Sequence, residues 1–176
     1  MVLLLPGLWN SGPENPQSYW ERERGDCVRV VQDDWETPRR EVWVATLEQA
    51  VRGAREPVVL SAHSLGCALV AHWAESAGAS VGRIRGALLV APSDVEAPSY
   101  PAGPTGFDPM PRRKLPFQAI VVASSNDKYV SMERASTFAA AWGARLVAAG
   151  ALGHINADSD LGNWPAGQKL LDDLLG

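Results

Sequence analysis

The chain has 176 residues, 46% of them hydrophobic and 20% charged, with a formal net charge of −4 and an isoelectric point near 5.4. This length predicts one domain spanning residues 1–176 and is enough to bury a core. The acidic balance argues against a nucleic-acid-binding protein, which carries a basic stripe, and we interpret the one dense basic cluster, Arg112-Arg113-Lys114, as a solvated loop.

Short apolar runs alternate with helical stretches along the chain. The apolar start lacks the basic region and cleavage site of a signal peptide, and no stretch has the length that spans a bilayer, so no membrane association is expected. The runs are apolar on both alternating faces, which is typical of a parallel sheet covered on both sides; we predict strands at Val2–Leu5, Cys27–Gln32, Pro57–His63, Arg85–Ala91, Gln118–Ser124 and Ala144–Ala149. Helices are predicted between them, at Gln17–Arg24, Pro38–Gly53, Leu65–Gly78, Met132–Trp142 and Ala166–Leu175.

This alternation predicts a doubly wound α/β fold, with a mostly parallel six-stranded sheet and helices on both faces. Thr37 is expected to cap the second helix, with Pro38 at its first position. The segment from Pro92 to Pro116 contains seven of the 13 prolines and few apolar runs. It is too long for an ordinary connection, so we predict a covering or functional loop.

The third predicted strand ends in Ala62-His63-Ser64-Leu65-Gly66 and passes directly into a helix. This layout is typical of a nucleophile elbow, a tight turn that projects a serine beyond the sheet edge, although alanine stands here in the position of the first glycine. The Leu65 N–H is then expected to be one donor of an oxyanion hole. The alternative is an ordinary strand-to-helix turn in which Ser64 only caps the helix.

A serine nucleophile needs a general base, and the base needs an orienting carboxylate. Hydrolases with this elbow have the chain order serine, acid, histidine. Of the three histidines, His154 lies in a loop after the last predicted strand and is the predicted base. His63 lies within the elbow and is expected to point away from the serine, and His72 lies in the middle of a helix and is expected to be structural or at the surface.

Three aspartates are candidates for the acid. Asp127 follows the penultimate strand in the polar turn Ser124-Ser125-Asn126-Asp127 and is preferred. Asp94 follows the preceding strand and comes second, and Asp108 lies in the middle of the long loop and comes last. The simpler interpretation of Asp127 is an ordinary turn or helix-capping residue.

The loop after the first strand is expected to supply the second oxyanion donor, which is the backbone N–H of either Leu8 or Trp9. Trp9 and Asn10 are also expected at a substrate pocket. The long proline-rich loop is expected to add three further lining residues, Tyr100, Phe107 and Met110.

With Ser64, Asp127 and His154 in place, the chain resembles the small serine hydrolases typified by retinoblastoma-binding protein 9. The resemblance covers nearly the whole chain, through "LLLPGLWNSGPE", "VVQDDWETPRREVWVATLEQAV", "SAHSLGC", "SSNDKYVS" and "GHINADSDLGNWPAG". It implies a compact α/β-hydrolase domain without a large cap and a catalytic triad of those three residues. One departure is Asn15-Pro16 before Gln17-Ser18, where bacterial members often have histidine-tryptophan close to the pocket mouth.

The expected function is that of a serine hydrolase, a carboxylesterase acting on small or short-chain acyl esters through an acyl-enzyme, without metal or organic cofactor. The two cysteines, Cys27 and Cys67, suit neither a disulfide framework nor a zinc site, and a cytoplasmic location is expected. One alternative is a non-catalytic protein-binding member of the fold, although the family's Leu-x-Cys-x-Glu motif is missing and the nearest stretch, residues 65–69, is expected to be buried. The other is a peptidase or acyltransferase with the same triad. The sequence makes no prediction of the oligomeric state.

Overall fold

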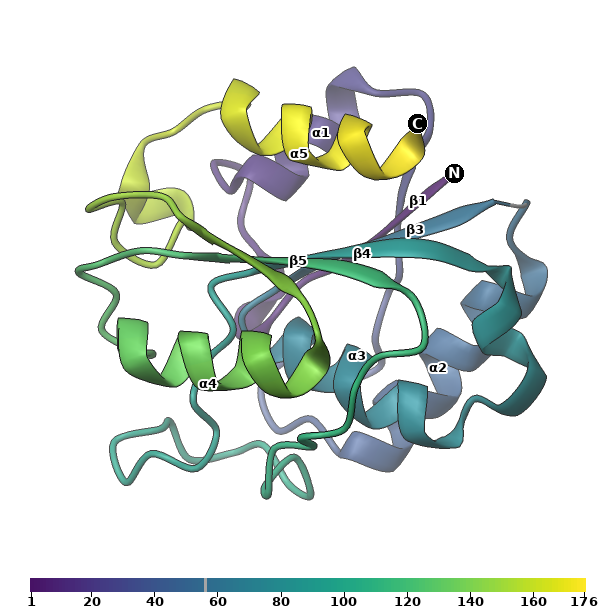
Figure 1. The fold of residues 1–176 in the computed structure, drawn as a ribbon, viewed down its shortest axis with the longest axis horizontal. Helices are drawn as coiled ribbons and strands as arrows, with labels where there is room; N and C mark the ends of the chain where they lie inside the picture. The colour runs from purple at the N-terminus through teal and green to yellow at the C-terminus, as the bar shows by residue number, and fades with distance from the viewer. Residues whose placement is uncertain (56) are drawn as a thin grey trace.

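A computed structural model describes residues 1–55 and 57–176 and contains one six-stranded parallel sheet, with the strand order β2-β1-β3-β4-β5-β6 (Figure 1). Every pairing between neighbouring strands in this sheet is parallel. The strands are β1 (Val2–Leu5), β2 (Cys27–Arg29), β3 (Val58–His63), β4 (Ile84–Val90), β5 (Gln118–Ala123) and β6 (Arg145–Ala148). The predicted α/β architecture is therefore confirmed, with β2 and β6 shorter than expected.

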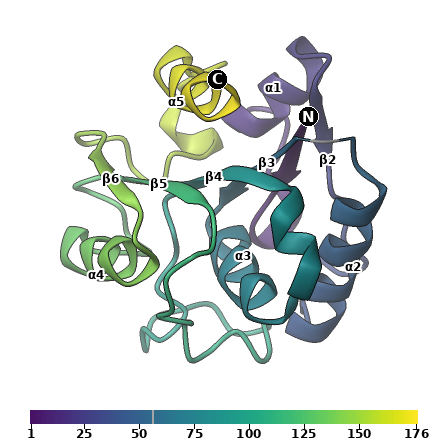
Figure 2. The same ribbon diagram turned by 45° about the vertical axis from the view of Figure 1, so that its right-hand side comes forward.

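Helices cover both faces of this sheet. Helices α2, α3 and α4 lie on one face, and α1 and α5 lie on the other (Figures 1 and 2). Their bounds are α1 (Pro16–Glu23), α2 (Arg40–Gly53), α3 (Leu65–Ser76), α4 (Met132–Trp142) and α5 (Pro165–Leu175), with short 3-10 turns at Leu8–Asn10, Gly78–Arg83 and Ala157–Ser159. Among the described residues, no helix combines the length and the apolar character needed to cross a lipid bilayer.

Two buried clusters explain why the strands are apolar on both alternating faces. Leu3 and Leu5 of β1 pack into the cluster beneath α2, α3 and α4, whereas Val2 and Leu4 pack into the cluster beneath α1 and α5. Successive side chains of a strand point to opposite faces, so a sheet covered on both sides needs apolar residues at every position. This arrangement places the carboxyl ends of all strands at one edge, where α/β proteins bind their ligands.

The start of α2 differs from the sequence prediction. The helix begins at Arg40, because Arg39 is extended, with φ −103° and ψ 124°. The Pro38 carbonyl accepts the Thr105 N–H at 2.9 Å, and the Arg40 N–H donates to the Thr105 carbonyl at 3.0 Å. These backbone hydrogen bonds to Thr105 replace the predicted helix cap. The Thr37 hydroxyl does not cap the helix but donates to Asp34 Oδ2 at 2.6 Å.

The long proline-rich loop covers the face formed by α2, α3 and α4 (Figure 1). Phe107 packs edge-on against Trp43 at a ring-centroid distance of 5.7 Å, and its carbonyl accepts the His72 Nε2–H at 2.8 Å. Phe107 and Met110 are each only 2% exposed and belong to the core cluster on this face. The prediction that these two residues line the substrate pocket is therefore wrong, and His72 has the structural role expected for it.

Candidate active site

Ser64 lies on a sharp turn between β3 and α3. Its φ of 57° and ψ of −122° fall outside the regions that non-glycine residues normally occupy, as expected for a strained functional turn. The Ser64 N–H donates to the Val90 carbonyl of β4 at 3.0 Å, which fixes the turn to the sheet. The turn packs closely on β1, because a Cβ added to Gly66 would lie 2.2 Å from the Leu5 carbonyl oxygen. A glycine at this position is therefore required, whereas the fully buried Ala62 fits at the other end of the motif.

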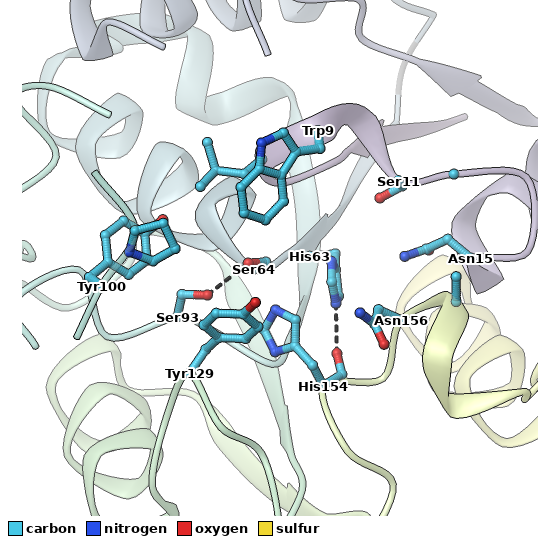
Figure 3. Close-up of a pocket in the computed structure, with 14 residues that line it drawn as sticks. Trp9, Ser11, Asn15, His63, Ser64, Ser93, Tyr100, Tyr129, His154 and Asn156 are labelled. Carbon is cyan, nitrogen blue, oxygen red and sulfur yellow. Dashed lines mark hydrogen bonds between the residues drawn. The ribbon is translucent and has the colours of Figure 1, made fainter. Parts of the chain in front are cut away.

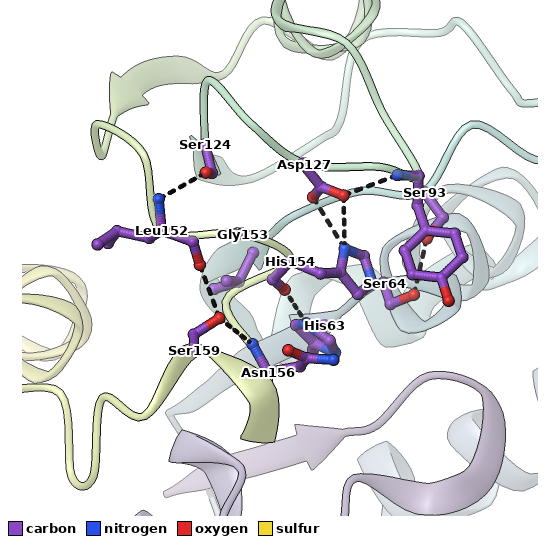
Figure 4. A network of polar contacts seen from close by, with 12 residues as sticks. His63, Ser64, Ser93, Ser124, Asp127, Leu152, Gly153, His154, Asn156 and Ser159 are labelled. Carbon is purple, nitrogen blue, oxygen red and sulfur yellow. Dashed lines mark hydrogen bonds and ion pairs between the residues drawn. The ribbon is translucent and has the colours of Figure 1, made fainter.

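His154 and Asp127 form a hydrogen-bonded pair on the loops after β6 and β5 (Figure 4). His154 Nδ1 lies 3.0 Å from Asp127 Oδ1 and 2.8 Å from Oδ2. The Asp127 side chain is 0% exposed and that of His154 is 7% exposed. Because a carboxylate only accepts hydrogen bonds, Nδ1 carries the proton in this pair and Nε2 is left as the basic nitrogen.

Ser64 and His154 both line one cavity of about 170 Å³ at the carboxyl edge of the sheet (Figure 3). The Ser64 hydroxyl shares a hydrogen bond of 2.7 Å with the Ser93 hydroxyl in this structure. The fold thus brings the serine, the histidine and the aspartate predicted from the sequence to one place. The hydrogen bonds of this structure join Ser64 to Ser93 and His154 to Asp127, and catalytic hydrogen bonds commonly form only once substrate is bound.

The other two aspartates do not contact His154. Asp94 forms a bidentate ion pair with Arg134, at 2.7 Å from Nε and 2.9 Å from Nη2. Asp108 is exposed on the long loop. Of the three candidates, Asp127 is therefore the one whose position suits the orienting carboxylate.

Two backbone N–H groups near Ser64 are candidates for an oxyanion hole. Leu65 begins α3, and the first N–H groups of a helix have no partner within the helix. Gly7 brings the first loop against this turn, since a Cβ added to it would lie 3.1 Å from the Leu65 nitrogen. The Trp9 N–H donates to the Trp35 carbonyl at 3.1 Å, so the Trp9 alternative is wrong and Leu8 is left as the first-loop candidate.

The predicted pocket residues are divided between the cavity and other places. Trp9 and Tyr100 line the cavity, and the Trp9 side chain, which is 55% exposed, lies at its mouth (Figure 3). Asn10 is not among the lining residues. Its Oδ1 instead accepts a hydrogen bond from Nη1 of Arg29 at 2.9 Å. That prediction is therefore wrong for Asn10, as it is for the two core residues of the long loop.

Several lining residues were not found by sequence reasoning. His63 Nε2 donates to the His154 carbonyl at 2.8 Å, and the two rings lie 4.8 Å apart. His63 thus lines the cavity, a role that was not predicted for it. Tyr129 packs against His154 at a ring distance of 4.5 Å, and its position two residues after Asp127 was the only sequence signal for it. Ser93 had no such signal beyond following β4.

Burial, and after it the neighbouring His154, lower the pKa of His63 from 6.5 to about 3. His63 is therefore neutral in the folded protein at pH 7, and its Nε2–H donates to a carbonyl. A neutral His63 adds no positive charge beside His154, and it holds the backbone that carries the imidazole.

We expect the protein to lose stability as the pH falls from about 6.5 towards 3, because the unfolded chain binds a proton at His63 that the folded chain does not. His63→Gln keeps an N–H donor for the His154 carbonyl and removes the titrating group. The melting temperature of this variant should therefore fall less steeply between about pH 6.5 and pH 5 than that of the wild type. Thermal unfolding followed by circular dichroism at several pH values measures both slopes. Equal slopes would show that His63 does not resist protonation in the fold.

The chain is similar to known hydrolases in sequence and in fold. The serine hydrolase family model matches residues 2–173. A YdeN-like hydrolase from Pectobacterium atrosepticum is 31% identical, with a TM-score of 0.86, and the match covers 99% of this chain and 89% of that one. The ydeN gene product of B. subtilis is 21% identical, with a TM-score of 0.77 and coverage of 99% and 97%.

A more distant similarity shows the fold alone. Esterase 2 of Thermogutta terrifontis is 16% identical, with a TM-score of 0.69, and the match covers 99% of this chain and 81% of the esterase. The comparison with curated proteins gave no match. Because the family model spans nearly the whole chain and a hydrolase of known structure shares about a third of its residues, this chain belongs to the serine hydrolase family.

Proposed function

We propose that the protein is a carboxylesterase that hydrolyses esters of small or short-chain acyl groups through an acyl-enzyme on Ser64. The observation that supports this most strongly is the His154–Asp127 pair, held by contacts of 3.0 and 2.8 Å, in the same cavity as a serine on a strained elbow. A hydroxyl, an imidazole and a buried carboxylate in this arrangement are the parts of a nucleophilic triad.

In the proposed reaction, the Ser64 oxygen attacks the ester carbon while His154 Nε2 accepts the hydroxyl proton. The Leu65 and Leu8 N–H groups stabilise the negative oxygen of the tetrahedral intermediate. The bond to the alcohol breaks, and His154 returns the proton to the departing oxygen. Water then attacks the acyl-enzyme, with His154 again taking and returning a proton, and the carboxylic acid leaves. Side chains and backbone supply every step, so the reaction requires no metal or organic cofactor.

Asp127 acts on this reaction through His154. Its two oxygens hold Nδ1–H, which keeps Nε2 unprotonated before attack and turned toward the serine. When the imidazole becomes cationic, the buried carboxylate stabilises that charge. Asp127 also accepts the Tyr129 N–H at 2.8 Å, and this contact orients the carboxylate.

The cavity favours small substrates. Its volume of about 170 Å³ is close to that of an engineered cavity of about 150 Å³ that holds one benzene molecule. Trp9, Tyr100 and Tyr129 are aromatic lining residues, and Ser93 and His63 also line the cavity. One short acyl chain or one small ring fits such a space, and a long chain has to extend into solvent.

The alternatives have less support in the fold. The stretch closest to a Leu-x-Cys-x-Glu motif lies on α3, where Leu65 and Cys67 are 0% exposed, so it cannot be presented to a protein partner. Among the residues that the structure describes, no contact favours a peptidase or an acyltransferase over an esterase. As part of the proposal we place the protein among the cytoplasmic small hydrolases that resemble retinoblastoma-binding protein 9.

A series of p-nitrophenyl esters tests the proposal. We expect kcat/KM to be highest for acetate, butyrate or hexanoate and to fall at least about tenfold for dodecanoate, because methylene groups outside the cavity gain no burial and impede entry. Release of p-nitrophenol measures each rate, and Ser64→Ala protein gives the background. Activity that rises steadily to dodecanoate, or wild-type activity at the background level, would contradict the proposal.

A further inference from the structure

Asn15 is a buried part of the cavity. It is 3% exposed and lines the cavity together with Ser64. Figure 3 shows it on the opposite side of Ser64 from Tyr100, near Ser11 and Asn156. The cavity therefore has a side lined by amides and a hydroxyl as well as an aromatic side.

The hydrogen bonds of Asn15 determine which end of its amide faces the cavity. Asn15 caps α1, because its Oδ1 accepts the Gln17 N–H at 3.0 Å. A carboxamide has one oxygen and one nitrogen, so this bond directs Nδ2 away from the helix end. Figure 3 shows the Asn15 nitrogen directed into the cavity. Within residues 1–55 and 57–176 of this structure, no hydrogen-bond partner is found for that nitrogen.

Neighbouring contacts hold this amide in place. The Asn15 N–H donates to the Gly12 carbonyl at 3.0 Å, and the Ser18 N–H donates to the Asn15 carbonyl at 2.9 Å. Gln17 Nε2 donates to the Ser61 carbonyl of β3 at 2.8 Å, which ties the start of α1 to the strand that carries the elbow. The amide is thus a preorganised donor, which loses little conformational entropy when a ligand binds.

We propose that Asn15 is a specificity-determining residue and that Nδ2 donates a hydrogen bond to a second oxygen of the substrate. This inference rests on the proposed esterase function and narrows its substrate class. The preferred esters carry a carbonyl or ether oxygen a few bonds from the scissile ester. A wholly apolar ester displaces water from Nδ2 and leaves the donor unpaired, which is unfavourable, whereas an acceptor oxygen replaces that water.

Two matched pairs of esters test this inference. In the first pair, ethyl 3-oxobutyrate has an acceptor oxygen in its acyl part that ethyl butyrate lacks. In the second pair, 2-methoxyethyl butyrate has an acceptor oxygen in its alcohol part that butyl butyrate lacks. Each pair gives a selectivity ratio of kcat/KM values, measured by titrating the released acid. Differences in chemical reactivity between the esters cancel when the ratio of a variant is divided by that of the wild type.

Asn15→Asp keeps a carboxylate oxygen for the Gln17 N–H and removes the N–H donors from the cavity. In this variant we expect the ratio of at least one pair to fall about tenfold or more, and the pair that falls shows which part of the substrate faces residue 15. The control is Asn163→Asp, which adds the same charge at an exposed position outside the cavity and should keep both wild-type ratios. Ratios within about twofold of wild type for both pairs in Asn15→Asp would overturn the inference.

Two further measurements keep the test decisive. Asn15→Ser also retains a capping oxygen without the amide. If circular dichroism shows that Asn15→Asp folds poorly, Asn15→Ser replaces it in the test, and the same loss of selectivity is expected. Binding of the four esters to Ser64→Ala protein, followed by ligand-observed NMR, separates this inference from the esterase proposal. Weaker binding of the acceptor esters to a protein that also carries Asn15→Asp supports the role of Asn15 even if the wild type hydrolyses none of them. Equal binding overturns that role.

Discussion

Ser64→Ala is expected to lower the turnover of short-chain esters by about 10⁶-fold, the loss found when the nucleophile of another serine hydrolase is removed. The physical reason is that Ser64 is the proposed site of the acyl-enzyme, so without its hydroxyl only the oxyanion donors and the binding of substrate remain to accelerate attack by water. Hydrolysis of p-nitrophenyl butyrate measures the loss.

Ser93→Ala is the matched control for this substitution. It removes the hydroxyl that shares a 2.7 Å hydrogen bond with Ser64 and lines the same cavity. We expect a loss of no more than about tenfold, the effect of one hydrogen bond. Both variants should keep the wild-type melting temperature within a few degrees. A loss near 10⁶-fold in Ser93→Ala, with Ser64→Ala still active, would assign the nucleophile to Ser93.

Asp127→Asn is expected to lower kcat by about 10⁴-fold while leaving the fold intact. Asparagine has nearly the same shape as aspartate. The Tyr129 N–H needs an acceptor at Oδ1, so the amide nitrogen takes the place of Oδ2, 2.8 Å from His154 Nδ1, and cannot accept the Nδ1–H. The amide therefore favours the tautomer with the proton on Nε2, and that nitrogen can no longer take the Ser64 proton. The buried negative charge that stabilises the imidazolium is also lost. Steady-state rates over a range of pH values measure both effects.

Asp94→Asn tests the other acid considered from the sequence. Asp94 is bound to Arg134 by contacts of 2.7 and 2.9 Å and does not contact His154. Breaking this ion pair is expected to lower the melting temperature and to change kcat less than about tenfold. A larger loss of kcat in Asp94→Asn than in Asp127→Asn would contradict the proposed role of Asp127.

Much of the fold was predictable because local patterns and packing agree. The four inner strands, β1, β3, β4 and β5, are buried on both faces, so a continuous apolar run was a sufficient signal for them. One error in a helix boundary lies at the start of α2, where Thr37 and Pro38 have the local features of a helix start. There the backbone bonds of residues 38–40 to Thr105 prevail, and a pairing between residues so far apart leaves no local signal.

The site was predictable where chain order reflects geometry. In a parallel sheet, a serine after β3, an aspartate after β5 and a histidine after β6 all arrive at the same edge. The direction of the long loop was not predictable in this way, because composition does not say which layer a loop covers. Phe107 and Met110 were therefore assigned to the pocket although they complete the core.

The supporting residues depend on contacts that only the fold creates. His63 and His154 are 91 residues apart in the chain, and neither position alone indicates their hydrogen bond. Asn15 has the sequence signal of a helix cap, and that cap is present. The direction of its free nitrogen depends on the cap bond and on the position of the loop beside the cavity. The cap bond has a sequence signal, whereas the position of the loop is known only from the structure.

The most direct test of the central claim is to expose the protein to a fluorophosphonate, digest it and locate the adduct by mass spectrometry. A serine activated by His154 reacts with this reagent, whereas an ordinary hydroxyl does not. The proposed site predicts one adduct, on Ser64, which disappears in His154→Ala protein. No adduct, or an adduct on Ser93 or any other residue, would contradict the claim that Ser64 is the nucleophile.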